Sequence, residues 1–115
     1  MIADTVADVV AALEGAGLRV AERAGDITPP VCYLQLGQVT TAGTVLAGGV
    51  LSVLYVHYIP VRGLDNLAGD AAALDALFAA LAPLAATDLV ATRTSVTITN
   101  DTWPCYRADL SALAV

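Results

Sequence analysis

The sequence predicts a single α+β domain. We expect a two-layer sandwich, in which two helices cover one face of a mixed or antiparallel sheet of four to five strands. Three observations lead to this prediction. A chain of 115 residues is one domain of ordinary size, spanning residues 1–115. Two alanine-rich segments have helical periodicity, and the segments around them alternate or are rich in β-branched and aromatic residues, as strands are.

The first helix is expected from Asp4, a good N-cap residue, to Glu14. Glycines at 15 and 17 then end it. One stripe of this helix is apolar and consists of Val6, Val9, Val10 and Leu13. Residues 18–23 alternate and predict a short first strand, and a polar bend with a Pro-Pro pair follows it.

A second strand is predicted from Val31 to Leu36, with Cys32, Leu34 and Leu36 on one face and Tyr33 and Gln35 on the other. The connection that follows, residues 37–49, is too long for a tight hairpin. We expect it either to extend as a β-arm or to fold over a partner. In a chain without catalytic groups, contact with another protein is the role that its length favours.

The third strand is predicted from Val50 to Val61, where only Ser52 and His57 are frankly polar. Twelve residues are too few to span a membrane as a helix, which takes about 20. Alternation places Leu51, Val53, Tyr55, His57 and Ile59 on one face and Val50, Ser52, Leu54, Val56 and Tyr58 on the other. Neither face suits bulk water, so we expect helices on one face and a neighbouring subunit on the other.

The second helix is expected over residues 67–81, capped by Asp65 or Asn66, with Leu67, Leu74, Leu77, Phe78 and Leu81 on its apolar side. A closing hairpin follows. Its first strand, 92–99, turns Thr94, Val96 and Ile98 inward, and Tyr106, Ala108 and Leu110 line its second strand. Trp103 and Pro104 are expected to fix the entry to that last strand, and an exposed contact role for Trp103 is the alternative.

The composition favours an oligomer and argues against nucleic-acid binding. Hydrophobic residues make up 57% of the chain and charged residues 14%. This is a larger share of apolar residues than a small monomer can easily bury. A protein whose small alanines exaggerate its hydropathy is the alternative. The net charge of −6 gives no basic footprint for DNA.

The residues that carry chemistry are few and scattered. His57 is the only histidine, and it lies in the middle of a strand, where a structural hydrogen bond is its expected role. Cys32 and Cys105 have no local ligand pair for zinc and are expected to be reduced, because the first residues do not form a secretion signal and the chain should fold in the cytoplasm. We therefore predict no enzyme, and no catalytic, cofactor-binding or metal-binding residues.

The order of these elements resembles the tail terminator proteins of long-tailed bacteriophages. The resemblance covers nearly the whole chain and rests on architecture, with no signature residues to transfer. It is carried by the opening helix ADTVADVVAALEGAG, the strands PPVCYLQL and VLSVLYVHYIPV, the helix NLAGDAAALDALFAALAPL and the closing TSVTITNDTWPCYRADLSALAV.

The resemblance implies a virion protein at the head-proximal end of the tail. Its subunits would form a six-membered ring on the tail tube protein, stop tube growth and join the head through connector proteins. DNA would pass through the lumen of the ring without specific binding. A ring needs two different patches per subunit. We expect a sheet patch and a loop patch, formed by Tyr55, His57, Tyr58, Val39, Thr41, Val45, Leu46 and Trp103.

Two other functions stay open. A head-tail connector or neck subunit has a similar size and also forms rings. From a different class, a small ligand-binding or enzymatic α+β domain would use the apolar sheet face as its pocket, with His57 and Tyr58 as the polar groups.

Overall fold

The fold was determined as a computed structural model, which describes residues 2–41, 49–61, 67–85 and 88–111. In chain order its elements are α1 (Ile2–Gly15), β1 (Val20–Ala21), the short 3-10 helix η1 (Ala24–Asp26), β2 (Val31–Thr41), β3 (Gly49–Ile59), α2 (Leu67–Leu81), the 3-10 helix η2 (Ala82–Leu84), β4 (Ala91–Ile98) and β5 (Asp101–Ser111).

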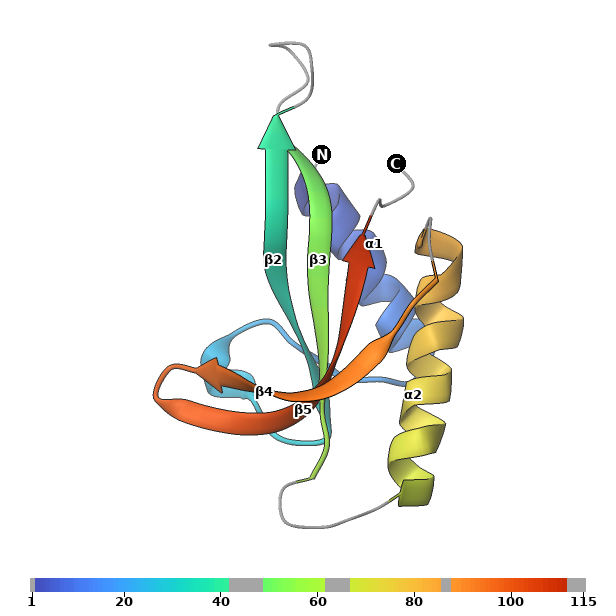
Figure 1. The fold of residues 1–115 in the computed structure, drawn as a ribbon, viewed down its shortest axis with the longest axis vertical. Coiled ribbons are helices and arrows are strands. Elements are labelled where there is room, and N and C mark those ends of the chain that lie inside the picture. Colours follow the sequence, from blue (N-terminus) through green and yellow to red (C-terminus); the bar gives the residue numbers. More distant parts are fainter. Residues whose placement is uncertain (1, 42–48, 62–66, 86–87, 112–115) are drawn as a thin grey trace.

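The strands form one five-stranded mixed sheet in the order β1-β2-β3-β5-β4 (Figure 1). β1 runs parallel to β2, and the other neighbours are antiparallel. In the centre of the sheet, His57 of β3 lies between Tyr33 of β2 and Arg107 of β5. The sheet and two helices confirm the predicted α+β class.

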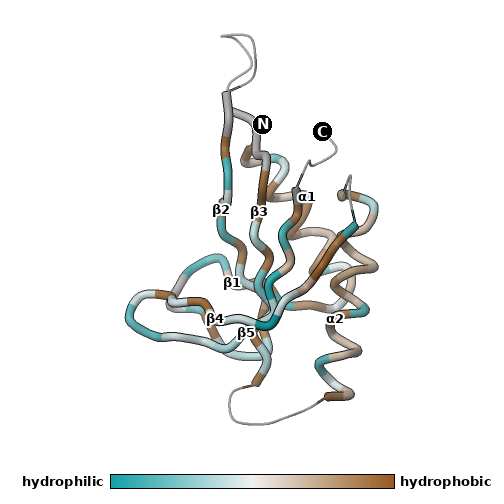
Figure 2. The backbone as a smooth tube through the Cα atoms, viewed as in Figure 1, coloured by the Kyte–Doolittle hydropathy of each residue, from teal (hydrophilic) through white to brown (hydrophobic). Residues whose placement is uncertain are grey.

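The main core joins both helices to the sheet. Its fully buried residues, called here the helix-side cluster, are Val9, Leu13, Cys32, Leu54, Val56, Tyr58, Leu77, Leu81, Ala108 and Leu110. Every β3 member of the cluster belongs to the even-numbered set that the sequence placed on one face. Figure 2 shows the corresponding apolar bands along the helices and the centre of the sheet, with polar residues at the outer end of the β4–β5 hairpin.

A second cluster occupies the opposite side of the sheet. Its buried residues, called the hairpin-side cluster, are Ala21, Val31, Ile59, Val96, Ile98 and Cys105, and Ile27, Tyr33 and Trp103 pack against them. The outer half of the β4–β5 hairpin bends across this side (Figure 1). The expectation that a neighbouring subunit covers this whole face is therefore wrong for the part around Val31 and Ile59, because the chain's own β4–β5 hairpin covers these two residues.

The β2–β3 pair continues beyond the body of the domain. β2 and β3 pair from Val31↔Ile59 to Thr41↔Gly49, with an irregularity around Gln38. Among the described residues, β5 pairs with β3 from Tyr58 to Val53. We call residues 36–41 and 49–52 the arm. Of the two alternatives predicted for residues 37–49, the pairing of residues 37–41 and 49 as strands confirms the extended β-arm at both ends of this segment; residues 42–48 lie outside the described residues.

Several finer predictions also need correction. The first helix begins two residues before Asp4, and the first strand is limited to Val20–Ala21. Thr94 is exposed rather than turned inward. Trp103 and Pro104 lie within β5 instead of before it. Cys32 and Cys105 are both free thiols, as expected, and lie in different clusters.

Helix α2 has the predicted bounds but not all of the predicted apolar side. Leu77 and Leu81 are buried, while Leu67 is 85% exposed. By length and composition, the stretch Leu67–Leu84 is apolar enough to cross a membrane. A core helix of a folded domain meets the same criterion, and the buried leucines of α2 belong to the helix-side cluster.

Candidate interaction surface

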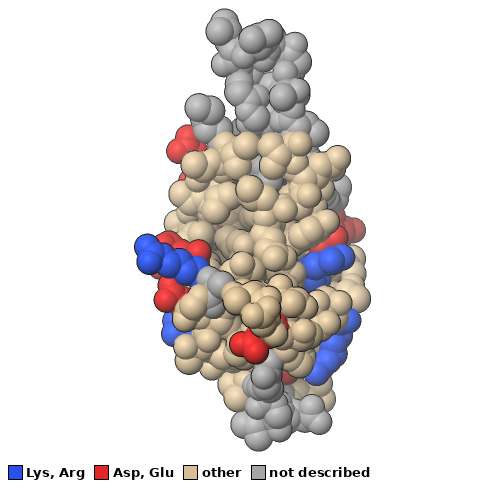
Figure 3. All heavy atoms as spheres, turned by 90° about the vertical axis from the view of Figure 1, so that its left-hand side faces the viewer, with Lys and Arg blue, Asp and Glu red and all other residues tan. Residues whose placement is uncertain are grey.

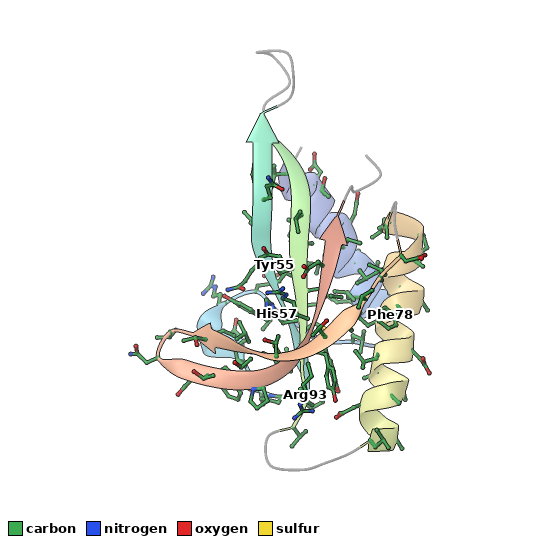
Figure 4. The ribbon with its side chains drawn as sticks, in the orientation of Figure 1. Tyr55, His57, Phe78 and Arg93 are labelled. Atoms are coloured by element: carbon green, nitrogen blue, oxygen red, sulfur yellow. The ribbon has the colours of Figure 1, made fainter. Side chains whose placement is uncertain are left out.

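An aromatic and cationic array lies on the odd-numbered face of β3. The ring of His57 is 6.3 Å from that of Tyr33 and 6.4 Å from that of Tyr55, measured between centroids. The Arg107 guanidinium carbon lies 4.8 Å from the centre of the Tyr55 ring, a cation–π distance. Arg107 also forms an ion pair with Asp109 at 3.0 Å. Figure 4 shows Tyr55 and His57 near one another along β3.

His57 is a structural residue of this array. Only 3% of its surface is exposed. Its Nδ1 lies 3.1 Å from the carbonyl oxygen of Tyr33, so an Nδ1–H group donates a hydrogen bond there. Burial lowers the pKa of the imidazole below its usual 6.5, and the positive charge of Arg107 acts in the same direction, against the opposing effects of that hydrogen bond and of Asp109.

This burial predicts a pH-dependent stability. Because the folded pKa lies below the unfolded one, the contribution of His57 to stability is complete above about pH 6.5 and is lost as the pH falls from there toward the folded pKa. The urea concentration at the unfolding midpoint should decrease between about pH 7.5 and about pH 5, and this decrease should be larger for the wild type than for His57→Gln. Equal falls in the two proteins would show that His57 protonates freely in the folded chain.

The remaining residues expected at an interface do not form one patch. Tyr58 is buried in the helix-side cluster, on the face opposite Tyr55 and His57, and burial raises the pKa of its phenol. Trp103 is half-buried against the hairpin-side cluster. Consequently His57 and Tyr58 do not share a face, and the pocket pictured for a ligand-binding domain does not bring them together.

The arm carries the other expected contact residues. Val39 lies in β2, and its side chain is 44% exposed. Thr41 pairs with Gly49 at the end of the described ladder. Val45 and Leu46 lie outside the described residues. At the base of the arm, Gly37 packs so closely that an added Cβ would lie 3.0 Å from both Tyr55 Cζ and the carbonyl oxygen of Val53.

An apolar groove, which was not predicted from the sequence, lies between α1 and the β1–β2 side of the sheet. One part, of about 520 Å³, is lined by Ala3, Val6, Ala7, Val10, Ala11, Glu14, Val20, Ala21, Glu22 and Leu34. A second part, of about 510 Å³, is lined only by Ile2, Ala3, Val6, Leu34, Leu36 and Leu54. The signal in the sequence was the alanine at every fourth position of α1, which leaves its outer side apolar as well as its core side.

The face that contains the β2 edge has few charges at its centre. Figure 3 looks onto this face, and most of its Arg, Asp and Glu side chains lie along the two sides. Leu36 is 56% exposed and adjoins the groove. Uncharged surface of this kind, next to exposed apolar side chains, is typical of a site of contact with another protein.

The described residues offer little for chemistry. Among them, no group of three or more His, Cys, Asp or Glu side chains is placed to hold a metal ion. Burial raises the pKa of the Cys32 thiol to about 12 and also raises that of Cys105, so both stay protonated and unreactive near neutral pH.

Comparisons with known proteins identify no family for this chain. No protein-family model, no curated protein and no solved structure matches the chain.

Proposed function

We propose that this chain is a structural subunit of a bacteriophage tail, a tail terminator that caps the tail tube as a ring, stops its polymerisation and provides the surface for head joining. The proposal rests on the predicted resemblance in element order and on the kind of surface that the fold leaves uncovered. A head-tail connector or neck subunit is the alternative, and the identity of the bound partner distinguishes the two.

The observation that carries the proposal is the projecting arm beside the apolar groove. The arm extends beyond the pairing with β5 that the described residues form, and on it Leu36 is 56% and Val39 44% exposed. Neither buried cluster, nor the partly buried residues packed against it, includes a residue of the arm. Contact with other subunits gives these apolar residues a partner.

The rest of the proposal follows from charge and chemistry. A net charge of −6 favours a lumen through which DNA passes without binding. We propose no catalytic activity and no cofactor. The partners are further copies of the chain, in a ring of six, the tail tube protein and the connector proteins, at the head-proximal end of the virion tail.

Electron microscopy of the purified protein, alone and after mixing with tail tubes of the same phage, tests the proposal. We expect rings, on the tubes if not free in solution, and tubes that stop growing once capped. Val39→Asp should reduce ring formation, because it places a charge on the exposed arm, whereas Val90→Asp, at a site 69% exposed outside the arm, should not. Small featureless particles under both conditions, with unchanged tube growth, would contradict the proposal.

A further inference from the structure

The groove between α1 and the β1–β2 side of the sheet is long enough for a partner helix. Its two parts share Ala3, Val6 and Leu34, so they are continuous with one another. On α1 the lining runs from Ile2 to Glu14, which is about 18 Å along the helix axis at 1.5 Å per residue. A second helix of roughly three turns therefore fits alongside α1.

The α1 wall of this groove allows close approach. Ala3, Ala7 and Ala11 recur at every fourth position of the helix and are all exposed. They lie on a different side of α1 from Val9 and Leu13, which are buried in the core. Small side chains at this spacing let another helix pack at a short interaxial distance. Among the described residues, nothing covers this second apolar side of α1.

The edge of β2 beside the groove is poorly suited to an added strand. Among the described strands, β1 already pairs with β2 at Cys32 and Tyr33, and the register of β2 with β3 becomes irregular after Leu36. The regular open edge is therefore limited to residues 34–36, and an irregularity of this kind hinders the pairing of a further strand. A helix, whose backbone hydrogen bonds are internal, needs only the apolar side chains of Leu34 and Leu36.

Acidic side chains border the groove. Glu14 and Glu22 line its part of about 520 Å³. Asp4 and Asp8 are exposed, and each follows one of the lining alanines, so they lie about 100° further round α1, at its border with solvent. No Arg or Lys is among the described residues that line the groove. An apolar strip with carboxylates at its borders is complementary to a helix whose apolar stripe is flanked by basic residues.

We infer that this groove binds an amphipathic helix of a partner protein, with Arg or Lys on both sides of its apolar stripe. The partner is not a second copy of the chain, because neither α1 nor α2 contains a basic residue. A helix of a copy would instead bring further carboxylates to an acidic border. This binding site goes beyond the proposed function, which concerns the arm and its contacts with further subunits.

A designed peptide tests the site. The probe is a peptide of about 18 residues, long enough to form a helix in water, with Leu along one stripe and Arg on both sides of it. The control peptide has Glu in place of each Arg. Fluorescence anisotropy should show saturable binding of the probe, and binding of the control peptide should be at least about ten-fold weaker, because its carboxylates meet those of the groove.

Two variants of equal net charge locate the binding. Ala7→Arg places a long cationic side chain in the groove and should weaken probe binding at least about ten-fold, through its bulk and its like charge. Ala72→Arg makes the same change at an exposed position of α2, which does not line the groove. Because salt screens remote exposed charges, it should stay within about two-fold of the wild type. Arg favours helix, so both variants should keep the wild-type circular dichroism.

Each outcome decides the matter. Equal weakening by the two variants, equal binding of the two peptides, or no saturable binding of the probe would overturn the site. If Ala7→Arg lost self-association but not probe binding, the groove would belong to copies of the chain, which would also overturn the inference. Rings on tail tubes without probe binding would overturn the site and leave the proposed function standing. Probe binding in a protein that forms no rings would do the reverse.

Discussion

Ile59→Ala is expected to lower the free energy of unfolding by about 2–5 kcal/mol, as truncation of a fully buried aliphatic side chain does. Ile59 is fully buried at the end of β3, among Val31, Val96, Ile98 and Cys105. The β4–β5 hairpin covers it, so the truncation leaves a cavity that the bent sheet fills only in part. Chemical denaturation of the two proteins measures the difference.

Val39→Ala is the control on the same side of the sheet. Val39 is 44% exposed on the arm, beyond the hairpin, and its truncation should change stability by less than about 0.5 kcal/mol. Comparable losses in the two variants would mean that the arm is covered in the free subunit. A small loss for Ile59→Ala would mean that the hairpin does not cover β3 in solution.

Leu77→Ala should also cost about 2–5 kcal/mol. Leu77 lies in α2 and is buried in the helix-side cluster. The loss would identify α2 as a core helix of the folded domain, in spite of a composition that meets the criterion for a membrane span. The measurement is again a denaturation midpoint with an unchanged slope.

Leu67→Ala provides the comparison within the same helix. Leu67 is 85% exposed at the first position of α2, and its truncation should leave stability within about 0.5 kcal/mol of the wild type. If Leu67→Ala were as costly as Leu77→Ala, the helix would bury a different face from the one described.

The local signals in the sequence predict most of the elements. Helical periodicity and an alanine-rich composition gave the bounds of α2, and alternation assigned Leu54, Val56 and Tyr58 to the helix side of β3. These predictions succeed because the side-chain period of a helix or strand is fixed by its backbone. The prediction that Leu67 lies on the buried side of α2 was wrong, because the periodicity of a helix does not show where the neighbouring sheet ends.

The covered second face could not be predicted in the same way, and the sequence predicted the arm only as one of two alternatives. Gly37 and the polar residues after it have a turn-like composition, and only pairing with β3 makes them a strand. The cover over Ile59 depends on the bend of the β4–β5 hairpin, which is a tertiary feature. The prediction of Tyr58 at an interface was wrong for a different reason, because alternation along β3 already placed it on the face opposite Tyr55, where the helices cover it.

Hydrogen exchange of the amides in residues 34–41 tests most directly whether this surface exists for assembly. In the dilute free subunit, amides on the open side of β2 should exchange quickly. In tails capped with the protein, we expect strong protection of this edge, because another chain then covers it. The same fast exchange in capped tails as in the free subunit would contradict it.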